Sequence, residues 1–161
     1  MNIPPIPVDT EAAAFLYTLA DHCFAWLEQH GEDAIGRLTD EQNTLLAYVY
    51  LDSQMEEGGF IRLIAGGYGG YIFDNPLTDS LRRWKIKATA RVLDAAAALY
   101  AEHGAAIEEA AEHGADDDTL RKRFPHFEEV DGDYYDAAET DLETAAAYVR
   151  SHWDKFSVLP D

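Results

Sequence analysis

Apolar side chains near the start of the chain recur at intervals of three and four residues, the spacing of one face of an α-helix. Asp9 or Thr10 can cap this segment, so we expect a helix that runs to about Gln29 and ends at Gly31. Residues 1–8 are expected to form an extended N-terminal arm. The predicted apolar face comprises Phe15, Leu16, Leu19, Ala20, Cys23, Trp26 and Leu27.

A second helix is predicted after Thr39, because Thr39 and Gln42 have the spacing of a capping box. Residues 45–51 are apolar on every side, which places this helix at the centre of the fold. A buried strand is the alternative, since the tyrosine and valine side chains of residues 48–50 favour strands. We prefer the helix because the capping box begins it and residues 54–57 suit its last turns.

The segment Met55–Trp84, here called the hub, holds six of the eleven glycines. Glycine frees the backbone and allows other segments to approach closely. Apolar residues lie between the glycine clusters, and helices on both sides are expected to pack on the hub. Asn75 and Pro76 then introduce the longest predicted helix, Thr78 to about His103, which Gly104 would end. Its predicted core positions are Leu81, Trp84, Ala88, Val92, Ala95 and Leu99.

The last third of the chain predicts shorter elements. A short helix should span 105–113 and end at Gly114, and a further short piece should end before Pro125. A loop is expected around Gly132, followed by a final helix over about 135–154. The predicted core positions of that helix are Ala138, Leu142, Ala145, Val149 and Trp153. These elements together predict an all-α fold: one helical domain around a glycine-rich hub, with a long central helix and acidic C-terminal helices.

The chain is strongly acidic, because 31 acids against 12 bases give a formal net charge of −19. The charge is −10 over residues 1–57, +3 over 58–100 and −12 over 101–161, so a mildly basic middle section has strongly acidic flanks. Such a chain repels nucleic acid and anionic membranes and attracts cationic partners. The single cysteine, Cys23, fits a reducing compartment. With neither a membrane-spanning run nor a signal-peptide pattern, we expect a cytoplasmic protein.

Rows of carboxylates on rigid helices suggest one function. Acids three or four residues apart recur about every 4.5–6 Å along a helix axis, whereas duplex DNA has a phosphate about every 3.4 Å on each strand. The two spacings do not match atom for atom. A rigid acidic helix can nevertheless offer a row of charges to the arginines and lysines of a DNA-binding protein, and so compete with DNA.

Two runs of the sequence resemble the small all-helical bacterial DNA-mimic proteins: DSQMEEGGFIRLIAGGYGGYIFDNPLTDSLRRWKI and FPHFEEVDGDYYDAAETDLETAAAYV. In that family an E-x-GGF-type hub precedes a long helix and an acidic tail section. The resemblance covers most of residues 38–156, although Glu57 stands where many related proteins have asparagine before the glycines. It implies a homodimer whose acidic surface occupies the DNA site of a helix-turn-helix repressor, so that transcription rises. It implies no catalytic residue and no cofactor.

Other functions find weaker support in the residues. The six histidines have no metalloprotease or di-iron spacing, and the hub glycines are not followed by the lysine of a phosphate-binding loop. His22 could act as a base for Cys23 only if both shared a cleft, and residues 116–118 leave a weak cation site open. An immunity-type inhibitor of a nuclease or nucleoid protein is a second interpretation of the acidic surface. An acidic scaffold without a DNA-binding partner is the third.

The candidate partner-binding residues are therefore carboxylates. The leading set lies in the last third of the chain: Glu108, Glu109, Glu112, Asp116, Asp117, Asp118, Glu128, Glu129, Asp131, Asp133, Asp136, Glu139 and Glu143. A second set extends it: Glu28, Glu32, Asp33, Glu56 and Glu57.

Overall fold

Helix α2 (Asp40–Ala65) lies at the centre of the molecule and contacts all of the other α-helices. The computed structural model describes all 161 residues. Along the chain the other elements are α1 (Ala12–His30), the 3-10 helix η1 (Glu32–Arg37), α3 (Gly69–Phe73), α4 (Leu77–Arg83), α5 (Lys87–Glu112), α6 (Asp117–Arg123), the 3-10 helix η2 (Pro125–Phe127), α7 (Glu128–Ser151) and α8 (Trp153–Phe156). The predicted all-α class and the central second helix are confirmed, and the strand alternative is excluded.

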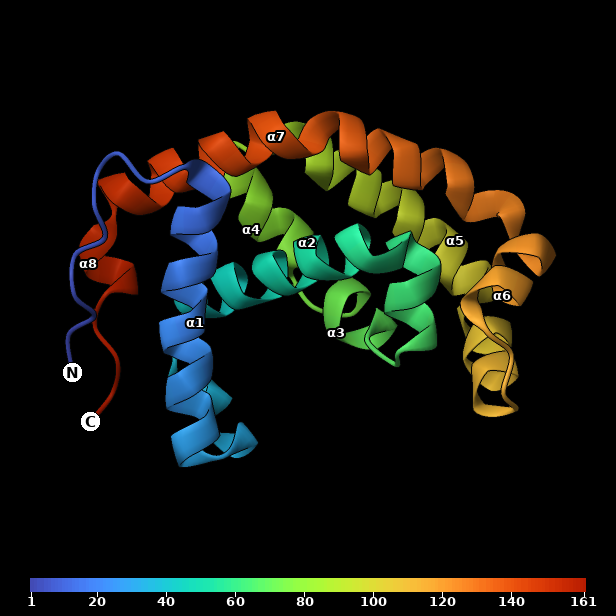
Figure 1. The fold of residues 1–161 in the computed structure, drawn as a ribbon, viewed down its shortest axis with the longest axis horizontal. Helices are drawn as coiled ribbons and strands as arrows, with labels where there is room; N and C mark the ends of the chain where they lie inside the picture. The colour runs from blue at the N-terminus through green and yellow to red at the C-terminus, as the bar shows by residue number, and fades with distance from the viewer.

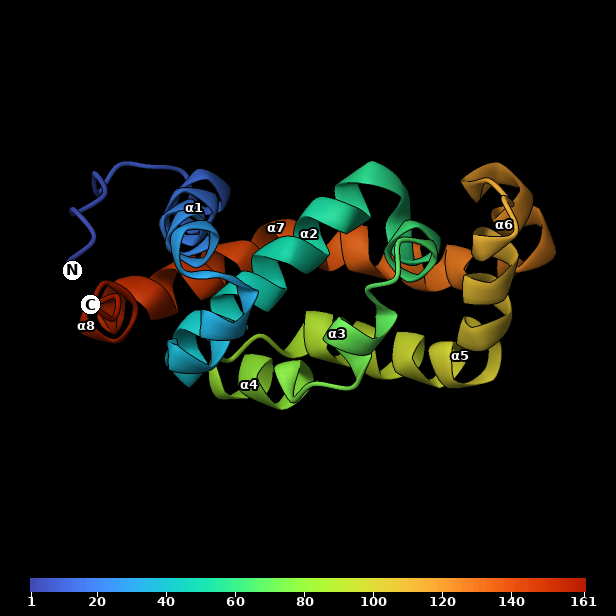
Figure 2. The ribbon, with the colours of Figure 1, turned by 90° about the horizontal axis from the view of Figure 1, so that it is seen from below.

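The helices form two levels around α2. Helix α7 arches along the whole upper edge, and the C-terminal half of α1 and α3 lie on the opposite side of α2 (Figure 1). Seen from below, α4 and α5 follow one another along one edge, and α2 runs diagonally between them and α1 (Figure 2). Forty buried apolar residues from all these levels form one continuous core.

The predicted capping box begins α2 as expected. The Thr39 hydroxyl accepts from the Gln42 N–H, and the Gln42 amide oxygen accepts from the Thr39 N–H, each at 3.0 Å. Gln42 is fully buried, and its amide nitrogen donates to the carbonyl groups of Phe156 and Val158 at 2.9 and 2.8 Å. The start of the central helix is thereby fixed to the C-terminal segment.

The N-terminal residues also reach that segment. Residues 1–10 contain no helix, Asn2 forms an antiparallel bridge with Val158, and the Ile3 N–H donates to the Ser157 carbonyl at 2.7 Å. Ile3 is buried, and the two chain ends lie side by side (Figure 1). No helix of the structure is long and apolar enough to span a membrane.

Helix α2 does not end before the glycines, as the sequence suggested, but continues to Ala65 through a kink at Gly58 and Gly59. Gly59 has φ +75°, a left-handed conformation that side chains rarely adopt. The hub therefore contains the last turns of α2, and the two glycines mark the point where the helix changes direction.

The predicted single helix over Thr78–His103 is wrong. The chain breaks between α4 and α5, where Lys85 adopts φ 70° and the Ile86 N–H donates to the Leu81 carbonyl at 2.9 Å. The break turns Trp84 into the core, where its ring stacks on Tyr148 at 4.9 Å between centroids. Because α5 restarts after the break, its buried face shifts from the predicted positions, leaving Ala95 exposed and burying Thr89, Ala90, Leu93 and Ala96.

Three further boundaries were also predicted wrongly. Gly104 does not end a helix, because α5 passes through it and continues to Glu112, so no separate helix spans 105–113. Gly104 instead makes room for the Tyr100 ring, whose Cδ1 atom would lie 2.5 Å from an added Cβ. The expected loop around Gly132 is helical, since α7 begins at Glu128, and that helix ends at Ser151.

Candidate acidic interface

The outward face of α7 carries the clearest row of acidic side chains. At 100° per residue, its five members fall within an arc of about 120°, and they extend over about 21 Å of the helix axis. The opposite face of α7 packs on the core through Val130, Tyr134, Leu142 and other apolar residues. All members of the row, which we call the α7 row, are exposed: Glu129, Asp133, Asp136, Glu139 and Glu143.

None of the α7 row acids forms an ion pair within the chain. Like charges three or four residues apart on a helix destabilise it, so the core contacts of α7 must hold this row in place. Helix α7 forms the convex upper edge of the molecule (Figure 1), and all five side chains of the row are exposed.

A shallow hollow of about 560 Å³ lies between α1, α2 and α7, beside the α7 row. It brings Glu56 of α2 next to Glu139 and Glu143 of α7, as residues of one lining. Glu11, which the sequence did not single out, adds a fourth exposed carboxylate. The lining also contains Arg150, but this guanidinium donates to the Thr10 carbonyl at 2.8 Å and lies over the Phe15 ring.

The floor of that hollow is a buried polar cluster. Asp52 is 3% exposed and accepts hydrogen bonds from the hydroxyl groups of Tyr17 and Tyr134, the latter at 2.6 Å. Burial, together with the Asp52 carboxylate, raises the pKa of both tyrosines, so both hydroxyls remain donors. Because the three residues come from α1, α2 and α7, this cluster fixes the helices that present the hollow.

Two carboxylates of α7 point inward instead and cap other helices. Asp131 accepts from the Phe60 N–H at 2.9 Å, where α2 resumes after its kink. Asp141, a buried residue absent from the predicted set, accepts from the Thr89 N–H at 2.7 Å in the first turn of α5. Both use the free N–H groups that a helix start leaves without partners. Asp131 is thus a structural residue, and burial raises its pKa to about 6.

Side chains from the last third of the chain also bind the carbonyl groups at the kink of α2. The Arg121 guanidinium donates to the Gly58 carbonyl at 3.0 Å, and the Tyr135 hydroxyl donates to the Met55 carbonyl. Together with Asp131, these side chains satisfy the backbone groups that the kink frees. The hub therefore positions the start of α7 directly.

Five other predicted acids have partners within the chain. Glu57 and Asp117 lie 3.6 and 3.7 Å from the Arg62 guanidinium, and Asp118 lies 3.0 Å from that of Arg121. Glu108 accepts from the Tyr100 hydroxyl at 2.7 Å.

Asp116 completes this group, because it caps α6 by accepting from the Thr119 N–H at 2.8 Å, and that bond lowers its pKa. Residues 116–118 do not converge on a cation, and no group of three or more His, Cys, Asp or Glu residues is arranged to hold a metal ion.

With Asp131 set aside too, twelve of the eighteen predicted acids remain exposed and without an ion pair, and they fall into three groups. Seven lie on or beside α7: Glu56, Glu128, Glu129, Asp133, Asp136, Glu139 and Glu143. Glu109 and Glu112 lie at the C-terminal end of α5, and Glu28, Glu32 and Asp33 lie at the corner of α1 and η1. That corner is on the opposite side of α2 from α7, so the structure does not join it to the α7 row (Figure 1).

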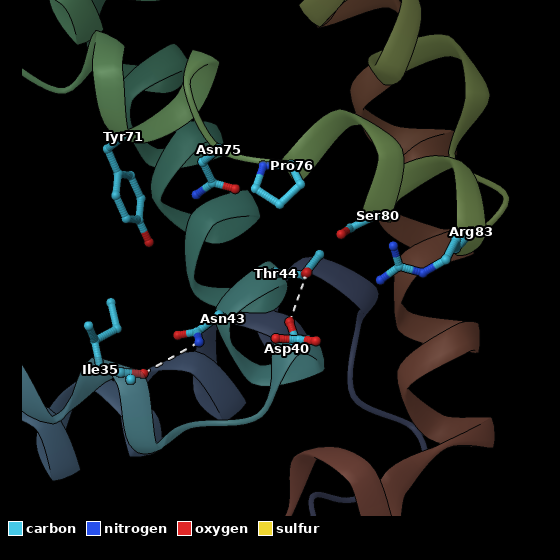
Figure 3. Close-up of a pocket in the computed structure, with 10 residues that line it drawn as sticks. Ile35, Asp40, Asn43, Thr44, Tyr71, Asn75, Pro76, Ser80 and Arg83 are labelled. Atoms are coloured by element: carbon cyan, nitrogen blue, oxygen red, sulfur yellow. Dashed lines mark hydrogen bonds between the residues drawn. The ribbon is translucent and has the colours of Figure 1, made fainter.

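The hollow at the start of α2 carries little net charge. This polar hollow of about 390 Å³ lies where the start of α2 meets α3 and α4 (Figure 3). Its one acid, Asp40, faces one base, Arg83, across neutral groups such as Thr44, whose hydroxyl donates to the Asp40 carbonyl at 2.9 Å. Cys23 and His22 do not share a cleft, because Cys23 is fully buried and His22 is exposed. Burial raises the pKa of the Cys23 thiol to about 12, which leaves it unreactive.

Comparison with known proteins places the chain in a family. Residues 36–152 match the model of the family described as "DMP19-like protein", a span that covers most of the helical body. The chain is also 56% identical over 157 residues to a protein of Neisseria meningitidis serogroup B named "DNA mimic protein DMP19". That alignment covers 98% of this chain and 95% of the relative. The chain therefore belongs to the DMP19-like protein family.

Proposed function

We propose that this protein is a DNA mimic that binds a basic DNA-binding protein through the α7 row and keeps it from DNA. The observation that carries the proposal is the set of five exposed, unpaired carboxylates on one face of a single helix. The name of the 56% identical relative, "DNA mimic protein DMP19", supports the same activity here.

The geometry suits competition with DNA better than atom-by-atom imitation. Five carboxylates over about 21 Å give one charge roughly every 5 Å, against about 3.4 Å between phosphates of one strand. Glu56 and Glu11 add charges beside the row, so the acidic band is wider than one helix. Flexible lysine and arginine side chains of a partner can reach such a band even though its spacing differs from that of DNA.

The partner that fits best is a helix-turn-helix repressor. Such proteins place a recognition helix in the major groove and basic groups on the flanking backbone, and the α7 row, about 21 Å long, offers carboxylates to such groups. Binding would remove the repressor from its operator and raise transcription. We further propose that the protein acts in the cytoplasm, without a cofactor or catalytic step, as a homodimer that presents two rows.

The first experiment captures the partner from a lysate of the source organism on the immobilised protein. The captured protein is then bound to its labelled DNA, and the mimic is titrated into the complex at about 50 and 200 mM salt. Release of DNA at low salt, with weaker competition at high salt, is the expected result, since screening weakens contacts between exposed charges. DNA that stays bound at both salt concentrations would contradict the proposal. Capture of a nuclease would instead favour the inhibitor function.

A pair of charge-matched variants locates the surface. Asp133→Asn, Asp136→Asn and Glu139→Gln together remove three charges from the α7 row, and we expect them to abolish competition at 200 mM salt. Glu28→Gln, Glu32→Gln and Asp33→Asn remove the same charge from the α1–η1 corner and should leave competition nearly unchanged. Equal losses in both variants would mean that total charge, and not the α7 row, determines binding.

A further inference from the structure

A third hollow, of about 820 Å³, lies among the elements on the side of α2 that faces away from α7 (Figure 1). The C-terminal half of α1, η1, α2 and α3 all contribute to its walls. Its size falls within the range of small-molecule sites, which are about 300–1,000 Å³. Neither the α7 row nor the proposed competition with DNA involves this hollow.

The walls are built from aromatic rings that meet at steep angles. The Tyr50 ring lies 4.7 Å from the Tyr68 ring and 6.1 Å from the Tyr71 ring, with interplanar angles of 51° and 82°. Phe24 of α1 completes the aromatic lining from the opposite wall. Tyr68 is 43% exposed, so its ring is accessible from the hollow. Aromatic faces at an angle form a corner that attracts organic cations through their negative π-faces.

Three carboxylates form the rim of the same hollow, and no lysine or arginine lines it. Asp21 and Glu28 are seven residues apart on α1, which places them on one face at a separation of about 10 Å. Glu32 of η1 is the third. All three are exposed and none takes part in an ion pair.

This combination excludes several occupants. A metal ion needs several oxygen atoms within a few ångströms of one point, whereas Asp21 and Glu28 are two helical turns apart. A second copy docked here about a twofold axis would bring the acidic rims together, because the same patch faces itself in such a dimer. An anion would meet only like charge.

The occupant that fits is a linear aliphatic amine with more than one cationic nitrogen. Its ammonium groups can pair with Asp21, Glu28 and Glu32, while the methylene segments between them lie against Phe24 and the tyrosine rings. We propose that the hollow between α1, η1, α2 and α3 is a binding site for linear polyamines. This site is independent of the proposed DNA mimicry.

Calorimetric titration with spermidine at about 150 mM salt tests the proposal, with Mg²⁺ as the comparison cation because it has charge but no methylene segments. The Asp21→Asn, Glu28→Gln variant and the Tyr68→Ala variant should each bind spermidine about tenfold more weakly. Tyr68→Phe should bind as the parent does, since it keeps the aromatic face. Glu139→Gln with Glu143→Gln, which removes the same charge from the α7 row, should change the affinity less than twofold.

Each other outcome overturns the proposal. If the α7 control loses as much affinity as the rim variant, or if Mg²⁺ displaces spermidine at equal concentration, the amine is only part of the counterion atmosphere. If a lysine-rich peptide binds the hollow more tightly than spermidine, the site belongs to a protein partner. If Tyr68→Ala binds normally while the rim variant does not, the aromatic corner has no part in recognition.

Discussion

The Asp131 carboxylate accepts a hydrogen bond of 2.9 Å from the backbone N–H of Phe60, a residue 71 positions earlier in the chain. It thereby caps the second half of α2, which resumes after the kink at Gly58 and Gly59. The acidic section and the hub are joined at this point. Together with the Tyr135 hydroxyl, which donates to the Met55 carbonyl, this inward carboxylate joins the first turns of α7 to α2.

Two substitutions at Asp131 should distinguish the effect of its hydrogen bond from the effect of its charge. Asp131→Ala leaves the part-buried Phe60 N–H without its acceptor, and we expect a loss of about 1–3 kcal/mol in the free energy of unfolding. Asp131→Asn keeps an oxygen in the same place, so its free energy of unfolding should fall much less. Urea unfolding followed by circular dichroism measures both. Equal stability of the alanine variant and the parent would show that the bond does not hold the hub.

The raised pKa of Asp131, to about 6, predicts a dependence of stability on pH. Between the ordinary aspartate pKa of about 3.9 and about 6, the folded state holds a proton that the unfolded state has released. This contribution to stability is therefore present below about pH 4 and is lost as the pH rises through 6. Measured from pH 7 down to pH 5, the parent should gain stability relative to Asp131→Asn. A constant difference between the two proteins over that range would contradict the predicted shift.

Gly59 should tolerate alanine less well than Gly67, although both have positive φ, +75° and +88°. An alanine Cβ at Gly59 would lie 2.4 Å from an Asp131 carboxylate oxygen, whereas Gly67 has nothing within 4 Å. Both variants carry the backbone strain, of about 1–3 kcal/mol, and only Gly59→Ala also displaces Asp131. Thermal unfolding of the two variants should show the larger fall in melting temperature for Gly59→Ala. A similar drop in both would mean that the carboxylate moves aside without cost.

These contacts show why local pattern predicted the first half of the chain better than the second. The capping box at Thr39 and Gln42 is a local signal, and it begins α2 as expected. Gly104 and Gly132 carry the local signal of a helix end or a loop, yet both lie inside helices, because packing of α5 and α7 on the core outweighs glycine's weak preference. The residues around Lys85 carry no local signal of the break between α4 and α5. The break accompanies the burial of Trp84, which depends on residues far along the chain.

The acidic site, too, could be predicted only where the signal is local in the sequence. Asp136, Glu139 and Glu143 are three and four residues apart, a spacing that puts them on one face of a helix, and in the structure they lie on the exposed side of α7. The sequence could not separate Asp131 from this row, because its partner, Phe60, lies far along the chain. For the same reason it could not identify Arg62 of the hub as the partner of Glu57 and Asp117.

Repulsion within the α7 row should make the parent less stable than a partly neutralised variant. Glu139 lies three residues after Asp136 and four before Glu143, and such like-charged pairs cost about 0.2–0.5 kcal/mol each. Glu139→Gln should therefore raise the free energy of unfolding by roughly 0.5 kcal/mol at low salt, and by little at 1 M salt, where charges are screened. Urea unfolding at both salt concentrations checks this. A gain that persists at high salt would have a cause other than charge repulsion.

The same glycine-to-alanine change should have opposite effects in α5 and α7. Alanine is favoured over glycine inside a helix by about 1 kcal/mol, so Gly132→Ala, with open space around it, should stabilise the protein by about that amount. Gly104→Ala would instead place a Cβ 2.5 Å from the Tyr100 ring. That ring also lies over Gly69 and stacks on Phe73 at 5.0 Å between centroids, so it has no free direction in which to move. We expect overpacking to cost about 1–3 kcal/mol, which exceeds the gain in helix propensity. Thermal unfolding of the two variants gives the sign of each effect, and a stabilised Gly104→Ala protein would show that the Tyr100 ring can shift without loss.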